Sequence, residues 1–579
     1  MDQQLFHARS VIFKQCFPMF FRLESETSND LHKLERGLNV KKRILATILS
    51  IGMLTSLLAG CAAGAAPAAA PAAPAETEEA AAPEETAAPA EEAEAVEAAE
   101  PAETAEAFDE VTDIEVILID FKGIPTEQGD RIVEEMNKIT EKTAGVRAHV
   151  TFIGPGDYPT QVGLMLSGGE PLDIIGLGIG SSAFAALIAN NQLMDITDLL
   201  DEYAPETLAF LGDYIDADSV NGRIYGVPPY RNYASSFYAV MRKDVLDELG
   251  LTDKAMSMTS FDDLAAIYAE VAEKTDLTPV GGSKQIFTTG YGNIYPGGSF
   301  EDAVIFDNLG DSYGIIFTDG EGNVSFRPEE EAQIKMYEMI RDWYDAGYVY
   351  KDSAITDDHP DTLTKAGILF SSLQISEMGI ESAKQEATGF EVVCPEIAKD
   401  LVYSASVNKF GLAVPVTSQE PEAAIRWINA YYTDPALANL FTWGVEGTDY
   451  VVEDGVARFP DGVDVNSVGF HNYDFMYGNY FEVLPWSGNT ADFRQQAMAF
   501  LEGADVSPYL GFAASQAGMD NIIAALNSVN DQYRPSIACG IYTDDDYSKY
   551  VTALKTAGAE EYVASYQEQL SAWMEATGK

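Results

Sequence analysis

Histidine and cysteine, which often carry catalysis or hold metal ions, are scarce in this chain. Among 579 residues there are five histidines and four cysteines, and they form neither an H-E-x-x-H nor a C-x-x-C motif. The glycine-rich stretch 176–180 lacks the order of a dinucleotide-binding turn, and no phosphate-binding lysine follows it. The acidic run 543–546 lacks the glycine and the terminal glutamate of a calcium loop and instead predicts the start of a helix. We therefore expect no metal, no cofactor and no catalytic activity.

Acidic side chains dominate the composition. Aspartate and glutamate number 92 against 35 lysines and arginines, which gives a formal net charge of −57. Such a charge repels phosphates and anionic headgroups, so we expect no nucleic-acid partner and no basic membrane-binding patch. Paired carboxylates can hydrolyse glycosides, but no pair here has a diagnostic spacing. A secreted glycan hydrolase is therefore a less favoured hypothesis.

Residues 41–61 have the order of an export signal. Lys41-Lys42-Arg43 precedes an apolar run that contains hydroxyl residues and ends in small ones, which is not a membrane span. The ending Leu58-Ala59-Gly60-Cys61 resembles a bacterial lipobox. This resemblance implies a lipid thioether on Cys61 and a lipoprotein anchored in the cell membrane, facing the outside of a Gram-positive cell.

Two segments flank this signal. Residues 1–39 do not fit a lipoprotein start, and we hypothesise that translation begins at Val40. Residues 40–60 would then be the signal peptide, and residues 1–39 an untranslated or disordered extension. After Cys61, residues 61–107 are almost wholly Ala, Pro, Glu and Thr, so they cannot bury enough apolar surface to fold. We expect a disordered tether there.

Residues 108–579 have the composition and length of a folded body of two lobes. Alternating or apolar runs predict strands at 114–120, 146–152 and 172–175, and helical spacing predicts helices at 127–143 and 158–167. Strands that alternate with helices favour an α/β class with a parallel sheet, whose ligands bind where the strands end.

Several phrases of the body carry a family resemblance. They are GGEPLDII (168–175), LMDITDLLDEY (193–203), NGRIYGVP (221–228), FYAVMRKD (237–244), SFDDL (260–264) and GLAVP (411–415). Their shared order resembles the extracellular solute-binding proteins (family 1) of ABC importers. The segments 510–512, 523–533 and 550–573 are similar to the oligosaccharide-type lipoproteins of Gram-positive bacteria within that family.

The resemblance implies a two-lobed, periplasmic-binding-protein-like fold, with a mostly parallel sheet flanked by helices in each lobe and a hinge between them. The lobes are expected at 108–228 plus 408–470 and at 233–405 plus 475–579. It also implies a monomer that closes on an oligosaccharide or other small solute and delivers it to the permease subunits of an ABC transporter. A peptide is a second candidate cargo, and a structural adhesin that works without a permease is a competing hypothesis.

Sugars are held by aromatic faces and by hydrogen bonds from polar side chains, so we expect such residues around the cleft between the lobes. We look for them in and next to phrases that resemble cleft-lining segments of the family. The candidate ligand-binding residues are Asp120, Phe121, Lys122, Ser181, Ser182, Tyr230, Arg231, Asn232, Ser371, Trp443, Glu446, Tyr477, Asn479 and Phe512. Ser371 is expected where an apolar strand of the second lobe ends. For Phe121 and Trp443, packing in the core is equally open, and Trp486 is either a rim aromatic or a packing residue. Whether Cys394 and Cys539 pair also stays open.

Overall fold

The computed structural model describes residue 108 and residues 110–579, except 179–180, 288–293 and 296–298. The predicted signal peptide, Cys61 and the tether lie outside the described residues. Residues Pro101–Lys579 form one compact unit. No helix within the described part of the chain is long and apolar enough to cross a membrane.

The first sheet has the strand order β15-β3-β1-β2. The strands β1 (Thr112–Ile119), β2 (Val146–Ile153) and β3 (Ile174–Leu177) pair in parallel, while β15 (Gly411–Ala413) pairs with β3 antiparallel. The helices α3 (Thr126–Thr143) and α4 (Tyr158–Gly168) connect the parallel strands. The predicted strands and helices of this region are therefore confirmed. β15 comes from residues far along the chain, so a returning segment adds the edge strand next to β3.

Apolar side chains from both sides of this sheet form the first core. It contains the strands β1 to β3, the returning segment 410–414 and the helices α15 (Pro421–Thr433) and α16 (Pro435–Trp443). Trp427 is 1% exposed there. The other elements of this region are α5 (Ser181–Ala189), α6 (Thr197–Tyr203), α7 (Pro205–Leu211), η2 (Gly212–Asp218), β4 (Ser219–Val220) and β5 (Arg223–Ile224).

The second sheet has the order β13-β6-β12-β7, with β14 also on β6. The strands are β6 (Ser236–Arg242), β7 (Thr278–Val280), β12 (Leu369–Ser376), β13 (Val392–Val393) and β14 (Glu396–Lys399). Only β12 and β7 pair in parallel, and β6 pairs antiparallel with β12, β13 and β14. The prediction of a mostly parallel second sheet was wrong, because β6 runs against all of its neighbours.

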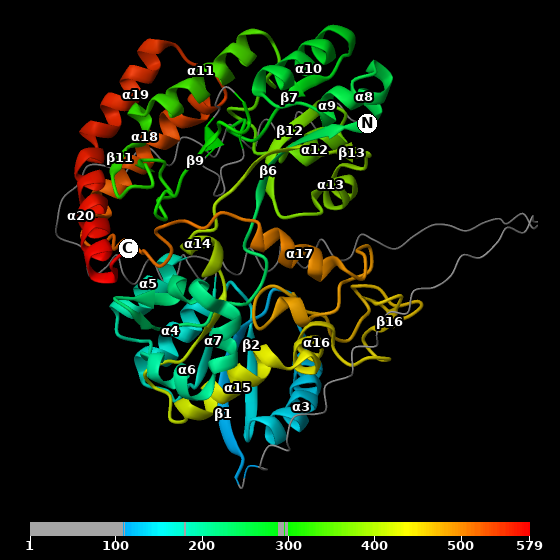
Figure 1. Cartoon of the computed structure of the whole chain (residues 1–579), viewed down its shortest axis with the longest axis vertical. Coiled ribbons are helices and arrows are strands. Elements are labelled where there is room, and N and C mark those ends of the chain that lie inside the picture. The colour runs from blue at the N-terminus through cyan, green and yellow to red at the C-terminus, as the bar shows by residue number, and fades with distance from the viewer. Residues whose placement is uncertain (1–107, 109, 179–180, 288–293, 296–298) are drawn as a thin grey trace, which may run out of the picture. The chain divides into compact units, whose positions relative to one another are not determined.

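A second core forms around this sheet. The helices α10 (Phe261–Lys274), α11 (Glu331–Asp345), α18 (Asp520–Ala538), α19 (Asp544–Thr556) and α20 (Ala559–Thr577) contribute to it. In Figure 1 the helices α18 and α19 lie beside α11, which precedes them by nearly two hundred residues, and α20 contacts β11 (Val324–Phe326). The remaining elements of this part are α8 (Lys243–Leu249), α9 (Thr252–Met256), β8 (Ile294–Tyr295), β9 (Val304–Ile305), β10 (Ile316–Thr318), η3 (Arg327–Glu329), α12 (Pro360–Lys365), α13 (Ile380–Thr388) and α14 (Ser404–Val407).

Two helix starts follow from their capping residues. Ser260 Oγ accepts a hydrogen bond from the Asp263 amide at 3.1 Å at the start of α10. Thr543 and Asp546 form a reciprocal capping box at the start of α19. The helix start at residues 543–546 was predicted from the sequence and is confirmed.

A small third cluster lies beside the first core. It contains Ala438, Trp443, Tyr450, Ala457 and Val483, with Leu484 and Trp486 packed against it. These seven residues are called the satellite cluster, and Ala457 belongs to the hairpin of β16 (Val451–Glu453) and β17 (Val456–Arg458). The cluster is tied to α3 by the ion pair between Arg131 and Asp449, whose carboxylate is 2% exposed. The chain then continues through η4 (Tyr480–Glu482) and α17 (Phe493–Glu502).

Candidate functional site

The loop after β1 is built by one buried carboxylate. Asp120 is 7% exposed. Its oxygens accept hydrogen bonds from the amides of Lys122, Gly123 and Ile124 at 2.7–2.9 Å. Asp120 therefore shapes the loop and presents the next two residues, since its acceptor sites are occupied by backbone.

Those next residues, Phe121 and Lys122, face a polar aromatic surface. Phe121 packs edge-on against Phe410 at 6.3 Å. Lys122 Nζ lies 3.9 Å from the centre of the Tyr473 ring, and Tyr473 is 36% exposed. Burial lowers the pKa of Lys122, and the negative charge of Asp474 acts in the opposite direction. An ammonium over an exposed ring gives a sugar both a flat apolar face and a hydrogen-bond donor.

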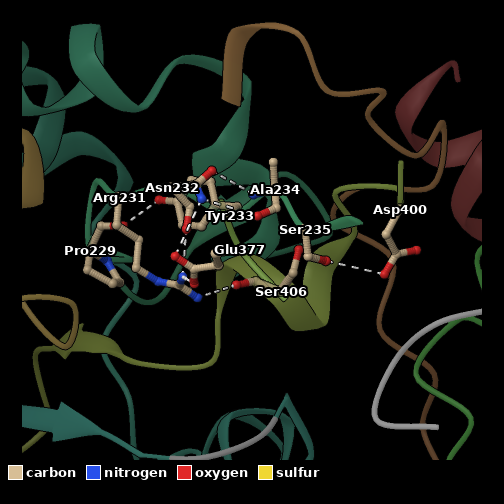
Figure 2. A network of polar contacts seen from close by, with 9 residues as sticks. All are labelled: Pro229, Arg231, Asn232, Tyr233, Ala234, Ser235, Glu377, Asp400 and Ser406. Carbon is tan, nitrogen blue, oxygen red and sulfur yellow. Dashed lines mark hydrogen bonds and ion pairs between the residues drawn. The ribbon is translucent and has the colours of Figure 1, made fainter. Parts of the chain in front are cut away.

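The chain crosses from the first core to the second at residues 228–235, and this crossing binds a carboxylate of the second lobe. Arg231 Nη1 donates to Glu377 Oε1 and Asn232 Nδ2 donates to Glu377 Oε2, each at 3.4 Å (Figure 2). Arg231 Nη2 also donates to the carbonyl of Ser406 at 2.8 Å, on a later crossing. Three separate segments therefore meet at the Arg231 guanidinium.

The Glu377 side chain is partly exposed, but its carboxylate has lost part of its hydration. Its side chain keeps 53% of its surface exposed, whereas the Arg231 side chain is only 9% exposed. Loss of solvation raises the pKa of Glu377, and the charge of Arg231 acts against that rise. The charges of Asp474 and Lys409 also reach Glu377. We call Lys122, Arg231, Asn232, Glu377, Tyr473 and Asp474 the crossing cluster.

Sequence reasoning missed Glu377 because it misplaced the end of a strand. Ser371 was expected there, but β12 continues to Ser376 and Ser371 lies inside it, 1% exposed. Ser371 Oγ donates to the carbonyl of Pro279 at 2.7 Å, so it is a structural residue. Gln374 and Ser376 interrupt the apolar run and hid its continuation. Glu377 directly follows the true strand end, which is the signal that could have found it.

Backbone contacts hold the crossings together. The amide of Tyr230 donates to the carbonyl of Gly478, and the amide of Tyr480 donates to the carbonyl of Tyr230, both at 2.9 Å. The amide of Asp400 donates to the carbonyl of Ser235 at 2.9 Å, and Figure 2 shows Ser235 Oγ directed at the same aspartate. These pairs fix the main chain of neighbouring crossings in register.

Two buried carboxylates flank these crossings. Asp218 is 0% exposed, and neither of its oxygens has a hydrogen-bond partner among the residues that the structure describes. Burial raises the pKa of Asp218 to about 8. Asp400 is 2% exposed, and burial raises its pKa to about 8 as well. Both side chains therefore favour the neutral form at the pH at which most carboxylates are charged.

Several predicted site residues are occupied by packing. Tyr477 is buried beneath the first sheet and its hydroxyl accepts from the amide of Ile119 at 3.3 Å. Asn479 caps η4 through the amide of Phe481. Phe512 lies in the second core against Trp573. Met476 and Tyr477, expected at the start of the second lobe, belong to the first core.

The remaining candidates lie apart from the crossing cluster or outside what can be described. Trp443 is 4% exposed and its Nε1 donates to the carbonyl of Leu484 at 3.0 Å, so it is a packing residue. Glu446 is exposed in the loop before Tyr450. Ser181 and Ser182 begin α5, but their side chains lie outside the described residues. Tyr230 is half-buried and stacks on Phe210 at 6.0 Å.

An aromatic group extends from the crossing cluster into the satellite cluster. Trp486 lies 4.6 Å from both Trp443 and Phe459 between ring centres. His471 stacks on Trp443 at 5.3 Å, and burial together with the charge of Lys122 lowers the pKa of His471 to about 4. His471 is therefore neutral and acts as an apolar ring. Trp486 packs here and keeps part of its surface accessible.

Signs of catalysis or metal binding are weak. A G-x-S-x-G order does occur at 310–314, but this segment joins β9 to β10 and is no strand-to-helix elbow. Within the described residues, no group of three or more His, Cys, Asp or Glu side chains could hold a metal ion. Cys394 and Cys539 are both free and buried, so the structure has no disulfide between them.

Comparison with known proteins places this geometry in a family. The model described as bacterial extracellular solute-binding protein matches residues 134–448, more than half of the chain. The chain belongs to the bacterial extracellular solute-binding protein family. A domain of unknown function matches residues 508–575 of this solute-binding protein.

Relatives agree with this assignment. A carbohydrate ABC transporter substrate-binding protein of Streptococcus pneumoniae serotype 4 is 25% identical over 452 residues, which cover 76% of this chain and 87% of that protein. The N-glycan transport solute binding protein NgtS of S. pneumoniae has a similar structure, with a TM-score of 0.65, 21% identity, and coverage of 80% and 99% of the two chains. An HMO-binding, ABC-transporter-associated protein of Bifidobacterium longum infantis has a TM-score of 0.57, 14% identity, and coverage of 80% and 99%. The predicted family and two-lobed α/β fold are confirmed.

Proposed function

We propose that this solute-binding protein captures an oligosaccharide at the crossing cluster and delivers it to the permease of an ABC transporter. The observation that carries the proposal is the juxtaposition of Lys122 and Tyr473 with Arg231, Asn232 and Glu377. It joins a flat aromatic surface to charged hydrogen-bonding groups from both lobes.

The two halves of the cluster have different tasks. The exposed Tyr473 ring offers a face for the C–H surface of a sugar ring, and Lys122 offers a donor to its hydroxyls. Glu377 offers acceptors, since its 3.4 Å contacts to Arg231 and Asn232 are long and its surface is half exposed. A ligand that bridges the two halves would stabilise one arrangement of the lobes by its differential affinity for it.

We further propose that the mature chain is a monomer held at the outer face of the cell membrane by a lipid on Cys61. The basic start, the apolar run and the lipobox-like ending support this anchoring. The Ala-, Pro- and Glu-rich segment 61–107 would then hold the two lobes away from the membrane.

Isothermal titration calorimetry of the purified full chain against defined neutral oligosaccharides and peptides tests the ligand class. We expect a saturable heat with one family of glycans, unchanged glycan by chromatography afterwards, and loss of the heat in Tyr473→Ala. Saturable binding of peptides alone would overturn the substrate, and release of shorter glycans would show that the protein is an enzyme.

A further inference from the structure

A small cavity lies at the seam between the two matched segments of the chain, away from the crossing cluster. Gly314 and Arg327 line it from the solute-binding match, and Arg534 and Tyr550 line it from the C-terminal domain of unknown function. The space open to the centre of a water-sized sphere is about 10 Å³. That is about the space of one water molecule, and the cavity is partly open to solvent.

The lining of this cavity is positively charged in a strongly acidic protein. Arg327 and Arg534 both reach it, and no aspartate or glutamate does. Arg327 is 7% exposed, and its Nε donates to Gln333 Oε1 at 2.8 Å. Across the described residues, no hydrogen bond or ion pair engages Arg534. Arg534 is partly exposed, and its positive charge beside that of the buried Arg327 is unfavourable to both.

An aspartate whose charge acts on the same tyrosine, Asp311, is already engaged. The electrostatic surroundings of Tyr550 include Arg327, Arg534 and Asp311. The Asp311 oxygens accept hydrogen bonds from the amides of Tyr313, Ile315 and Ile316 and from the Tyr562 hydroxyl, at 2.6–3.2 Å. Asp311 therefore folds its own loop, and its oxygens are occupied by donors other than the Arg534 guanidinium.

We propose that this cavity binds a small monovalent anion of about the size of chloride, between Arg327 and Arg534. The guanidinium groups supply charge-assisted hydrogen bonds, and the phenol of Tyr337, which also lines the cavity, supplies a further donor. The anion stabilises the packing of α18 and α19 on η3 and α11.

Thermal unfolding of the full chain in sodium chloride and in sodium gluconate of equal ionic strength tests the proposal. An anion that binds only the folded chain raises the melting temperature by about 1–2 °C for each tenfold excess over its dissociation constant. We expect this rise in chloride and bromide, and its loss in Arg534→Gln. Arg458→Gln, at an exposed arginine paired with Glu453 and Asp461, should keep it.

A crystal grown in bromide supplies the independent readout. We expect an anomalous peak between Arg327 and Arg534 in the wild-type chain. Equal melting temperatures in chloride and gluconate, an equal halide effect in Arg534→Gln, or a cavity without an anomalous peak would each overturn the proposal. If Arg534→Gln fails to fold, the bromide crystal of the wild-type chain decides alone. None of these results depends on the oligosaccharide proposal.

Discussion

The ammonium of Lys122 lies 3.9 Å from the centre of the Tyr473 ring, although about 350 residues separate the two along the chain. Lys122 follows the first strand of the first sheet, and Tyr473 lies in the late loop before η4. The pair brings the end of a parallel strand and this loop to one surface. No ion pair within the described residues engages Lys122, so its charge is available to a ligand.

We expect Lys122→Met to weaken glycan binding while leaving the fold intact. The methionine keeps most of the apolar stem but removes the donor and the charge, and the loss of such a contact raises Kd by about 5- to 30-fold. Calorimetry measures the change, and circular dichroism checks the fold. Lys351→Met, at an exposed lysine of the second lobe, is the matched control and should bind as the wild type does.

Glu377 is a site residue that the structure adds, whereas Glu446 is one that the sequence suggested. The substitutions Glu377→Gln and Glu446→Gln therefore compare the two residues. The amide keeps one acceptor but loses the charge and places a donor opposite Arg231 and Asn232, so we expect Kd to rise about 10-fold. Glu446→Gln makes the same change in an exposed loop and should leave Kd unchanged. Equal effects of the two variants would contradict the site described here.

Gly478→Ala should destabilise the chain where two crossings meet. Gly478 has φ +74°, and an added Cβ would lie 2.8 Å from Cζ of the buried Tyr431 ring. We expect a loss of about 2–4 kcal/mol in the free energy of unfolding, from strain and overpacking together. Gly462→Ala has a similar φ of +80° with open space around the new methyl group, so denaturant titration should show a loss of only about 1 kcal/mol.

Asp218 links stability to pH. Its pKa is about 8 in the folded chain and near 4 when unfolded, so the folded chain holds an extra proton between these values. The stability contributed by the neutral carboxyl is complete below about pH 4 and is lost as pH rises towards 8. Asp218→Asn should remove the Asp218 part of this slope, leaving the part that comes from Asp400, and should stabilise the chain at pH 8 by on the order of 2–4 kcal/mol.

The comparison that isolates this effect is a pH series of denaturant titrations. Asp198→Asn is the control, because the Asp198 side chain is 86% exposed and should leave the pH slope unchanged. If the free energy of unfolding of Asp218→Asn changes with pH as steeply as that of the wild type, Asp218 is charged in the folded chain.

Cys61→Ser should release the protein from cells into the medium if Cys61 carries the lipid. Metabolic labelling with a fatty acid should mark the wild-type chain and not the variant. Cys394→Ser, at a free buried cysteine, is the control and should retain the label.

The fold was more predictable than the site. Apolar periodicity predicted β1 to β3 and their helices, and residues 543–546 predicted the start of α19. Both predictions succeeded because these signals depend on neighbouring residues only. The site depends on distant contacts: Tyr473 reaches Lys122 through the path of the late loop, and Glu377 reaches Arg231 through the end of β12. Trp443 and Tyr477 show the opposite error, since an aromatic in a loop can equally be buried.

The satellite cluster bears on which part of this chain can change in sequence during evolution. It has its own small apolar centre, and it is joined to the first lobe by the helix α16 and by the Arg131–Asp449 pair. Its aromatic rings adjoin the residues that precede Tyr473. A different hairpin could be grafted there without rebuilding either sheet. The hairpin is therefore a place in the first lobe where evolution can change sequence and length with little disturbance of the two sheets.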